Sequence, residues 1–480
     1  MTGQALWQAD AAAQATGGQM KGNWSQGHAD ITGISIDTRS LVAGDLFIAL
    51  QGPKFDGHDY VAQAFEKGAA AAMVHRTIEG LENDAALLMV DDTLGALWRL
   101  GAAGRERSKA RFIAVTGSVG KTSTKEALKN CLSAQAPTAA SPGSLNNHWG
   151  VPLSLARMDQ NATYGVFELG MNNPGEILEL ARLVRPQIGL ITNVEAAHLG
   201  NFESIGAIAD AKSELFQAMD RDGVAVLNRD HPLFHHLRDK AELAGVTKLI
   251  TFGQHQDSTI RLLNHTLELD GSSVEADVGG KEIHYHVGAP GWHWVTNSLA
   301  VLAASFAAGA DAATAGRSLA DLEALKGRGA RHVIPYDSGS FTIIDESYNA
   351  NPASMRAAIS LLGQADPAAN GRRVAVLGDM LELGPSSGYL HRKLSEPLRE
   401  AEVDLVYCCG PEMEKLYRAL PKRLQGGHCP NSQELAPMVI EGLEVNDVVL
   451  IKGSLGSRMA VILDALLNIE DTPPKAANGG

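Results

Sequence analysis

The chain has 480 residues, of which 45% are hydrophobic and 20% charged, proportions that exclude wholesale disorder and fibrous repeats. At about 150 residues per domain, this length predicts about three domains. Lysine and arginine number 41 against 55 acidic residues, a net charge of −14 without any basic run. This balance disfavours a general nucleic-acid or anionic-membrane surface but leaves a local anion site open.

The four cysteines include no CxxC pair, so a disulfide framework and a cysteine-based zinc site are both disfavoured. The N-terminus lacks the basic segment of a secretory signal and carries Asp10 early. No apolar run approaches the roughly 18 residues that a membrane span requires. We therefore expect a soluble, cytoplasmic protein that neither binds nucleic acid nor inserts into a membrane, with a monomer as the default state.

The elements predicted along the chain form a small α/β unit followed by two larger ones. Before residue 93 the pattern is irregular, with a helix near 59–68. Residues 255–290 alternate polar and apolar and predict an antiparallel extension of the sheet that precedes them. Short apolar runs that alternate with helical patterns, typical of parallel βαβ units, occur at 111–117, 164–170, 188–194 and 223–228, and again at 341–347, 372–379, 404–410 and 447–454.

The segment GSVGKTS at 117–123 follows a predicted strand and precedes a predicted helix. A glycine-rich turn before a helix presents backbone N–H groups to phosphate oxygens, while Lys121 can neutralise phosphate charge and the Thr122 hydroxyl can reach Mg²⁺. Val115 stands where the full GxxxxGK[ST] pattern has its first glycine, which leaves the shorter GxxGKT form. We expect ATP or GTP as the ligand; the alternative is a glycine-rich turn with a solvated lysine.

Glu168 ends one predicted strand and His198 follows another, so both are expected at the carboxyl edge of the sheet, where α/β proteins bind ligands. The pair suits a Mg²⁺ site, although Mg²⁺ prefers oxygen ligands, and a satisfied edge or core position is an equal alternative for either residue. The spacing of Lys212 from acidic residues in a helical segment favours a surface lysine in an i,i+4 network. The segment 346–352 predicts only a loop.

Together, these segments resemble the Mur ligases, ATP-dependent ligases that build the peptide stem of peptidoglycan, over about residues 30–465. The resemblance implies an α/β fold of three domains: a UDP-sugar-binding domain at 1–92, a central P-loop-type ATPase domain at 93–332 and a C-terminal Rossmann-like domain at 333–480. The tail after residue 470 is expected to be disordered. The segments that carry the resemblance are TGSVGKTS (116–123), FELGMNNPGEI (167–177), ITNVEAAHLGNFES (191–204), AKSELF (211–216), ESYNANPASM (346–355), VLGDMLELG (376–384) and IKGSLGSRM (451–459).

The resemblance implies a nucleotide site in which Lys121 and Thr122 hold the β/γ-phosphates and Mg²⁺, and Asn297 contacts adenine. The family often has two aspartates before SYNAN, whereas this chain has Asp345 and Glu346, and the second carboxylate would hold the ribose. The full implied set is Gly117, Ser118, Val119, Gly120, Lys121, Thr122, Ser123, Asn297, Glu346 and Asn349.

Further residues match other parts of the family's site. Glu168 and His198 match metal-site residues, and Lys212 matches a lysine that is carbamylated in several members. Arg328 matches an arginine that reaches the γ-phosphate across the domain boundary, so the implied catalytic set is Lys121, His198, Lys212 and Arg328. The region for the uridine nucleotide, where ordinary turn chemistry is the alternative, is matched by Ser35, Asp37, Thr38 and Arg39.

Within the family, YNANP, GDMLELG and KGSLGSRM resemble the member that adds D-alanyl-D-alanine to UDP-N-acetylmuramoyl-tripeptide. The implied reaction uses ATP and Mg²⁺ to activate the tripeptide carboxylate as an acyl phosphate, from which the dipeptide amine displaces phosphate. The alternatives are another ligase of the superfamily, such as a folylpolyglutamate synthetase, and a nucleotide-switch ATPase that ligates nothing.

Overall fold

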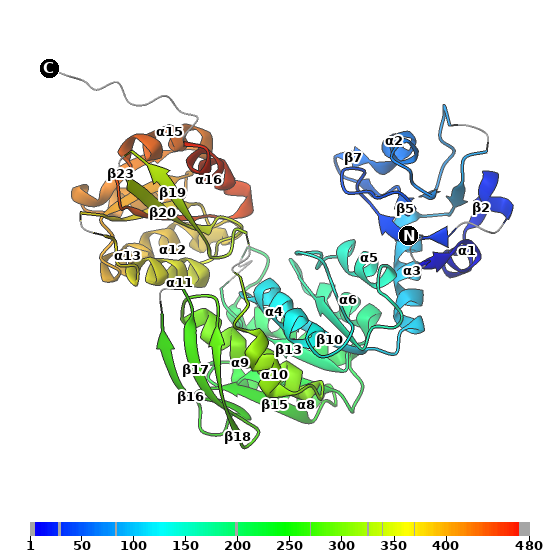
Figure 1. The fold of residues 1–480 in the computed structure, drawn as a ribbon, viewed down its shortest axis with the longest axis horizontal. Coiled ribbons are helices and arrows are strands. Elements are labelled where there is room, and N and C mark those ends of the chain that lie inside the picture. Colours follow the sequence, from blue (N-terminus) through cyan, green and yellow to red (C-terminus); the bar gives the residue numbers. More distant parts are fainter. Residues whose placement is uncertain are drawn as a thin grey trace.

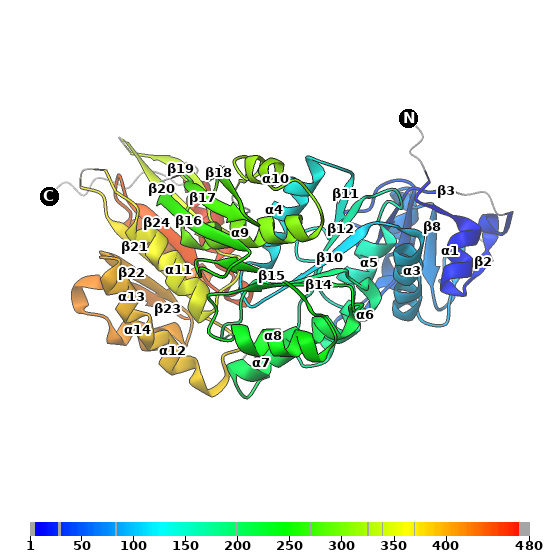
Figure 2. The ribbon, with the colours of Figure 1, turned by 90° about the horizontal axis from the view of Figure 1, so that it is seen from below.

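The computed structural model describes residues 5–26, 30–81, 84–196, 200–268, 270–323, 326–337, 339–368 and 370–469. Three α/β units follow one another along the chain, and the N-terminal and C-terminal units lie at opposite ends of the molecule with the central unit between them (Figures 1 and 2). This architecture confirms the predicted three-domain α/β fold. The tail predicted to be disordered after residue 470 lies outside the described residues.

The N-terminal unit is built on a five-stranded sheet in the order β2-β9-β8-β5-β4, which is parallel except for β2. The helix predicted near 59–68 is α2, which a 3₁₀ turn at Gly57–Tyr60 precedes. The elements are β1 (Trp7–Gln8), α1 (Ala9–Thr16), β2 (Gln19–Lys21), β3 (Asp30–Ile31), β4 (Gly33–Ser35), β5 (Asp45–Ile48), β6 (Gln51–Gly52), β7 (Phe55–Asp56), α2 (Val61–Glu66), β8 (Ala71–Val74) and β9 (Leu87–Met89).

The central unit holds a nine-stranded sheet in the order β11-β12-β10-β13-β14-β15-β16-β17-β18. The strands from β11 to β16 are parallel, and β17 and β18 add the predicted antiparallel extension. The strands are β10 (Arg111–Thr116), β11 (Thr138–Ala140), β12 (Tyr164–Glu168), β13 (Ile188–Ile191), β14 (Val224–Asn228), β15 (Lys248–Gly253), β16 (Ile260–Leu267), β17 (Ser272–Val278) and β18 (Lys281–Val287).

Helices cover both faces of the parallel part of this sheet, which explains why its strands are continuous apolar runs rather than alternating ones. In β10, Ile113 and Val115 pack with α4 and α9, whereas Phe112 and Ala114 pack with the helices of the opposite face. The helices are α3 (Thr93–Arg107), α4 (Lys121–Ser133), α5 (Gly150–Ala156), α6 (Glu176–Val184), α7 (Ile205–Ser213), α8 (Phe234–Leu243), α9 (Trp292–Ala307) and α10 (Ala312–Ser318).

The C-terminal unit has a six-stranded sheet in the order β19-β20-β24-β21-β22-β23, parallel except for β19, between two helical layers, as the Rossmann-like prediction requires. The strands are β19 (Ala330–Tyr336), β20 (Gly339–Glu346), β21 (Arg373–Gly378), β22 (Leu405–Cys409), β23 (Gln425–Cys429) and β24 (Val448–Lys452). The helices are α11 (Pro352–Gly363), α12 (Ser387–Lys393), α13 (Ser395–Glu400), α14 (Met413–Ala419), α15 (Ser432–Gly442) and α16 (Ala460–Leu467).

Hydrophobic packing or secondary structure continues across each of the two predicted domain boundaries. Helix α3 begins at Thr93, and its buried face shares one hydrophobic cluster with the N-terminal unit and with α5. Strand β19 runs across residue 332. The boundaries at residues 92 and 332 therefore stay predictions. Within the described ranges, no helix combines the length and the apolar character that crossing a membrane demands.

Candidate active site

A cavity of about 680 Å³ lies where loops at the carboxyl ends of the central strands meet loops of the C-terminal unit. This is the edge at which parallel α/β sheets bind ligands. The predicted site residues that line it are Ser118, Val119, Gly120, Lys121, Thr122, Ser123, Glu168, Asn297, Arg328, Glu346 and Asn349. Two units thus contribute side chains to one cavity.

The predicted phosphate loop joins β10 to α4 and is tied to the end of β13. The backbone N–H groups of Ser118 and Val119 donate to the backbone oxygen and to Oδ1 of Asn193, at 3.1 and 2.9 Å. At Gly120 the backbone has φ 82°, and a Cβ there would lie 2.9 Å from Oδ1 of Asn297. Only glycine fits this turn without strain. Asn297, on α9, therefore lies directly against the loop.

Lys121 begins α4 and folds back over the loop, where its Nζ donates to the carbonyl of Gly117 at 2.8 Å. Burial lowers the pKa of Lys121, the Glu168 carboxylate opposes this effect, and the positive charge of Arg328 adds to it. The lysine thus occupies a site with too little negative charge around it. A phosphate group beside Nζ would supply that charge.

Thr122 and Glu168 form the oxygen-rich part of the site. Thr122 Oγ1 donates to Glu168 Oε2 at 2.8 Å, and Asn146 Nδ2 donates to the other carboxylate oxygen at 2.7 Å. Glu168 is only 1% exposed and ends β12. Asn146 was not predicted, because an asparagine in a loop carries no signal that distinguishes it from ordinary turn chemistry.

Lys212 lies on α7 with 3% of its surface exposed, so the interpretation as a surface lysine is wrong. Burial lowers its pKa far below the ordinary value, and the charge of Lys121 lowers it further. Among the residues that the structure describes, no side chain forms an ion pair with its Nζ. His198, the other predicted metal ligand and catalytic residue, lies outside the described residues.

Arg328 stacks on Tyr348, with its guanidinium carbon 4.3 Å from the centre of the ring. Tyr348 Oη donates to Ser144 Oγ at 2.7 Å, a hydrogen bond from the C-terminal unit to the central one. The N–H of Gly200 donates to the carbonyl of Glu382 at 2.9 Å and makes a second bridge. Tyr348 was not predicted, because its hydrogen-bond partner, Ser144, lies far away in the chain.

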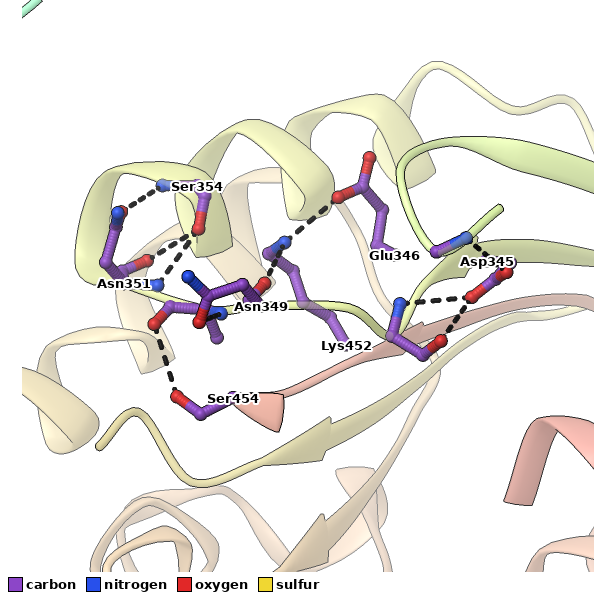
Figure 3. A network of polar contacts seen from close by, with 10 residues as sticks. Asp345, Glu346, Asn349, Asn351, Ser354, Lys452 and Ser454 are labelled. Atoms are coloured by element: carbon purple, nitrogen blue, oxygen red, sulfur yellow. Dashed lines mark hydrogen bonds and ion pairs between the residues drawn. The ribbon is translucent and has the colours of Figure 1, made fainter. Parts of the chain in front are cut away.

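The two acidic residues that end β20 have different surroundings (Figure 3). Asp345 is completely buried and accepts hydrogen bonds from Gly327 N–H and from the N–H and hydroxyl of Ser347, so it serves the fold. Glu346 faces the cavity and accepts from Lys452 Nζ at 3.0 Å. Of the two acidic residues, the one predicted to hold the ribose is therefore the one that lines the cavity.

The four residues matched to the uridine-nucleotide region lie in the N-terminal unit, away from this cavity. Ser35 Oγ donates to the carbonyl of Asp37 at 3.0 Å, and Thr38 Oγ1 donates to Gln63 Oε1 at 2.7 Å. Arg39 is exposed and pairs with Asp37 at 2.6 Å, which lowers the pKa of that carboxyl. None of the four lines the 680 Å³ cavity.

This arrangement, a nucleotide-type loop that faces a second α/β unit across a cavity, is typical of ATP-dependent ligases built from three domains. The chain matches the descriptions "Mur ligase family, catalytic domain" at residues 30–102, "Mur ligase middle domain" at 115–305 and "Mur ligase, glutamate ligase domain" at 332–455. It belongs to the Mur ligase family.

Named relatives cover nearly the whole chain. It is 35% identical to the "UDP-N-acetylmuramoyl-tripeptide--D-alanyl-D-alanine ligase" of Rickettsia prowazekii, over 90% of this chain and 94% of that protein. A crystal structure of MurF from Acinetobacter baumannii matches with a TM-score of 0.82 and 32% identity, over 96% of this chain and 98% of the other. MurF ligase from Thermotoga maritima, solved in complex with ADP, matches with a TM-score of 0.74 and 26% identity, over 91% of this chain and 97% of that chain.

Proposed function

We propose that this chain joins D-alanyl-D-alanine to UDP-N-acetylmuramoyl-tripeptide with ATP, and thereby makes UDP-N-acetylmuramoyl-pentapeptide for peptidoglycan. The observation that carries the proposal is the cavity in which the phosphate loop of the central unit faces Arg328 and Glu346 from the junction with the C-terminal unit. The near-complete coverage of relatives with this named activity supports it. The four unpaired cysteines fit a reducing, cytoplasmic location.

The reaction proceeds in two steps. An oxygen of the tripeptide's terminal carboxylate attacks the γ-phosphorus of ATP, so that ADP leaves and an acyl phosphate forms. The free amine of the dipeptide then attacks the carbonyl carbon; phosphate leaves with the electron pair of the broken C–O bond, and the nitrogen loses a proton. Lys121 and Arg328, which both line the cavity, would neutralise charge on the transferring phosphoryl group.

The residues present fit a Mg²⁺ ion, because the phosphate loop leads directly to a buried set of oxygen donors. Thr122 Oγ1 and the Glu168 carboxylate would hold it, with Asn146 orienting the carboxylate. The ion would neutralise phosphate charge and orient the β/γ-phosphates. The protein's own contribution is to keep the hydroxyl and carboxylate fixed at the end of β12 and the start of α4.

We also propose that Lys212 is carbamylated. The reaction of an amine with CO₂ requires the unprotonated form, and burial beside Lys121 favours that form. Nitrogen attack on the carbon of CO₂ and loss of one proton give a carbamate with a negative charge. The modified side chain would then supply negative charge beside Lys121.

The N-terminal unit is proposed to hold the uridine nucleotide through the segment from Ser35 to Arg39. Closure of the C-terminal unit over the cavity would exclude water from the acyl phosphate, which hydrolyses when exposed. Asn297, against the phosphate loop, and Asn349 are proposed as further nucleotide contacts. The enzyme is proposed to act as a monomer.

The test is phosphate release by the purified protein with Mg-ATP, UDP-N-acetylmuramoyl-tripeptide and D-alanyl-D-alanine, each omitted in turn, with the product identified by mass spectrometry. Release that requires all three and yields the pentapeptide nucleotide supports the proposal. Release that ignores the dipeptide would favour a nucleotide-switch ATPase. A different ligated product would point to another ligase of the superfamily.

A further inference from the structure

Lys452 and Glu346 end two neighbouring strands of the C-terminal sheet. Strands β20 and β24 are parallel, and these two residues are partners in the register, so their side chains leave the sheet on the same face. Lys452 Nζ donates to Glu346 Oε2 at 3.0 Å and to the carbonyl of Asn349 at 2.9 Å. Figure 3 shows the lysine reaching from its strand to both partners.

The burial of Lys452 makes these two contacts energetically important. The residue is 2% exposed, and an ammonium group removed from water is costly unless charged and polar partners replace the water. Both of its partners belong to the stretch 346–351, called here the cavity loop. The pairing therefore attaches the first residue of the cavity loop, Glu346, and the backbone of Asn349 to β24.

Other contacts hold the remaining parts of the cavity loop. Ser454 Oγ donates to the carbonyl of Ala350 at 3.3 Å, and Asn351 caps α11 through a reciprocal pair of hydrogen bonds with Ser354. Neither of these contacts reaches the Glu346 carboxylate, so among the described residues Lys452 is its ion-pair partner. The orientation of that carboxylate depends on the lysine.

We propose that Lys452 is a positioning residue that fixes the Glu346 carboxylate and the Asn349 backbone toward the nucleotide. This inference rests on the proposed function, which takes Glu346 and Asn349 as nucleotide contacts. Although Lys452 also lines the cavity, its charge is already paired with Glu346. It acts through its neighbours rather than on the reacting atoms.

His293 on α9 offers a way to detect this charge pair from the central unit. Burial lowers the pKa of His293, Glu346 raises it and Lys452 lowers it, so the histidine senses both members of the pair. Removal of the lysine charge alone leaves the carboxylate unopposed. The pKa of His293, followed by NMR, should then rise, and it should return when glutamine also replaces Glu346.

The test compares Lys452→Met, Lys452→Arg, Glu346→Gln and the double variant Glu346→Gln/Lys452→Met. We expect Lys452→Met to raise the KM for ATP about tenfold, with the KM for the UDP-tripeptide within about twofold of wild type. Arginine should restore most of the ATP affinity. The double variant should bind ATP no more weakly than Glu346→Gln alone, because the lysine acts through the carboxylate.

Lys415→Met is the matched control, since it removes a lysine from an exposed ion pair with Glu412 in the same unit. It should leave the kinetics unchanged. Thermal unfolding of each variant identifies loss of fold, and the double variant, which leaves no unpaired charge, is used if Lys452→Met does not fold. Additive losses in the double variant, or equal increases of both KM values, would overturn the proposal.

Calorimetric titration with ATP measures the same affinities without any ligation. It therefore separates this inference from the proposed substrate, because a chain that ligates a different peptide would still show the coupling between Lys452 and Glu346. If the product is the pentapeptide nucleotide but ATP binding ignores Lys452, only the positioning role is refuted.

Discussion

Replacement of Thr122 by valine removes one hydroxyl from a buried carboxylate and keeps the shape of the side chain. Thr122 Oγ1 donates to Glu168 Oε2 at 2.8 Å, and Glu168 is 1% exposed. A hydrogen bond to a charged group contributes about 1.5–3 kcal/mol, which corresponds to roughly a 10- to 150-fold change in an equilibrium constant. We expect the KM for Mg-ATP to rise within that range, because the carboxylate loses a fixed partner and the proposed Mg²⁺ site loses a ligand.

The assay follows phosphate release against Mg²⁺ concentration at fixed ATP. Thr122→Ser keeps the hydroxyl and should stay close to wild type. Thr138→Val is the matched control, because it removes a hydroxyl that donates to a backbone carbonyl at 2.9 Å on an edge strand outside the cavity. A valine variant at residue 122 with wild-type dependence on Mg²⁺ would refute the reasoning.

Three further predictions concern lysines and a histidine. Lys121→Ala should abolish ATP turnover yet leave UDP-tripeptide binding measurable by calorimetry, since the uridine site is proposed in another unit; loss of both in a folded variant would contradict that assignment. With ¹³C-bicarbonate, the wild type should show a carbamate signal by NMR that Lys212→Met lacks, because burial lowers the lysine pKa; equal signals from both would exclude this modification. Burial also lowers the pKa of His391; the Met380 N–H donates to its Nε2 and favours the neutral ring, while the Ser387 carbonyl beside Nδ1 acts in the opposite direction. Below pH of about 6.5 the unfolded chain therefore takes up a proton more readily than the folded chain does. Stability is thus complete above that pH and falls below it by up to about 1.4 kcal/mol per pH unit. The Tm measured between pH 7.5 and 5 should decrease less steeply in His391→Gln, and equal slopes would argue against this histidine as a source.

The strands that carry the site could be predicted from the sequence because both faces of each are buried. Strands β10, β12 and β13 are therefore apolar in their interiors, and polar residues such as Glu168, which ends β12, and Thr192, which follows β13, line the cavity. The strands that escaped prediction include β11, β19 and β23, which lie at sheet edges. Strand β11 has three residues, and β23 contains two adjacent glycines, so neither shows an apolar run.

Within the site, local pattern was sufficient for Lys121 and Thr122, because a glycine turn and a helix start place them without help from distant residues. Lys212 shows the limit of such reasoning: its spacing suggests an exposed helix face, but packing of α7 on the sheet buries it. The pair of Glu346 and Lys452 depends on strand register between segments 106 residues apart. No local pattern encodes that register.

Several cationic side chains lie at or beside the central cavity of a chain whose overall charge is −14, and glutamates such as Glu168 and Glu346 line the same cavity. Lys121, Arg328 and Lys452 line one cavity, and Lys212 is buried close to Lys121. Lys452 is paired with a carboxylate, whereas burial lowers the pKa values of Lys121 and Lys212. The charge of Arg328 adds to this effect at Lys121, and the charge of Lys121 adds to it at Lys212. A polyphosphate in the cavity would supply negative charge beside Lys121, so it would favour the protonated form of that lysine. Nucleotide binding and the protonation of Lys121 are therefore expected to be coupled.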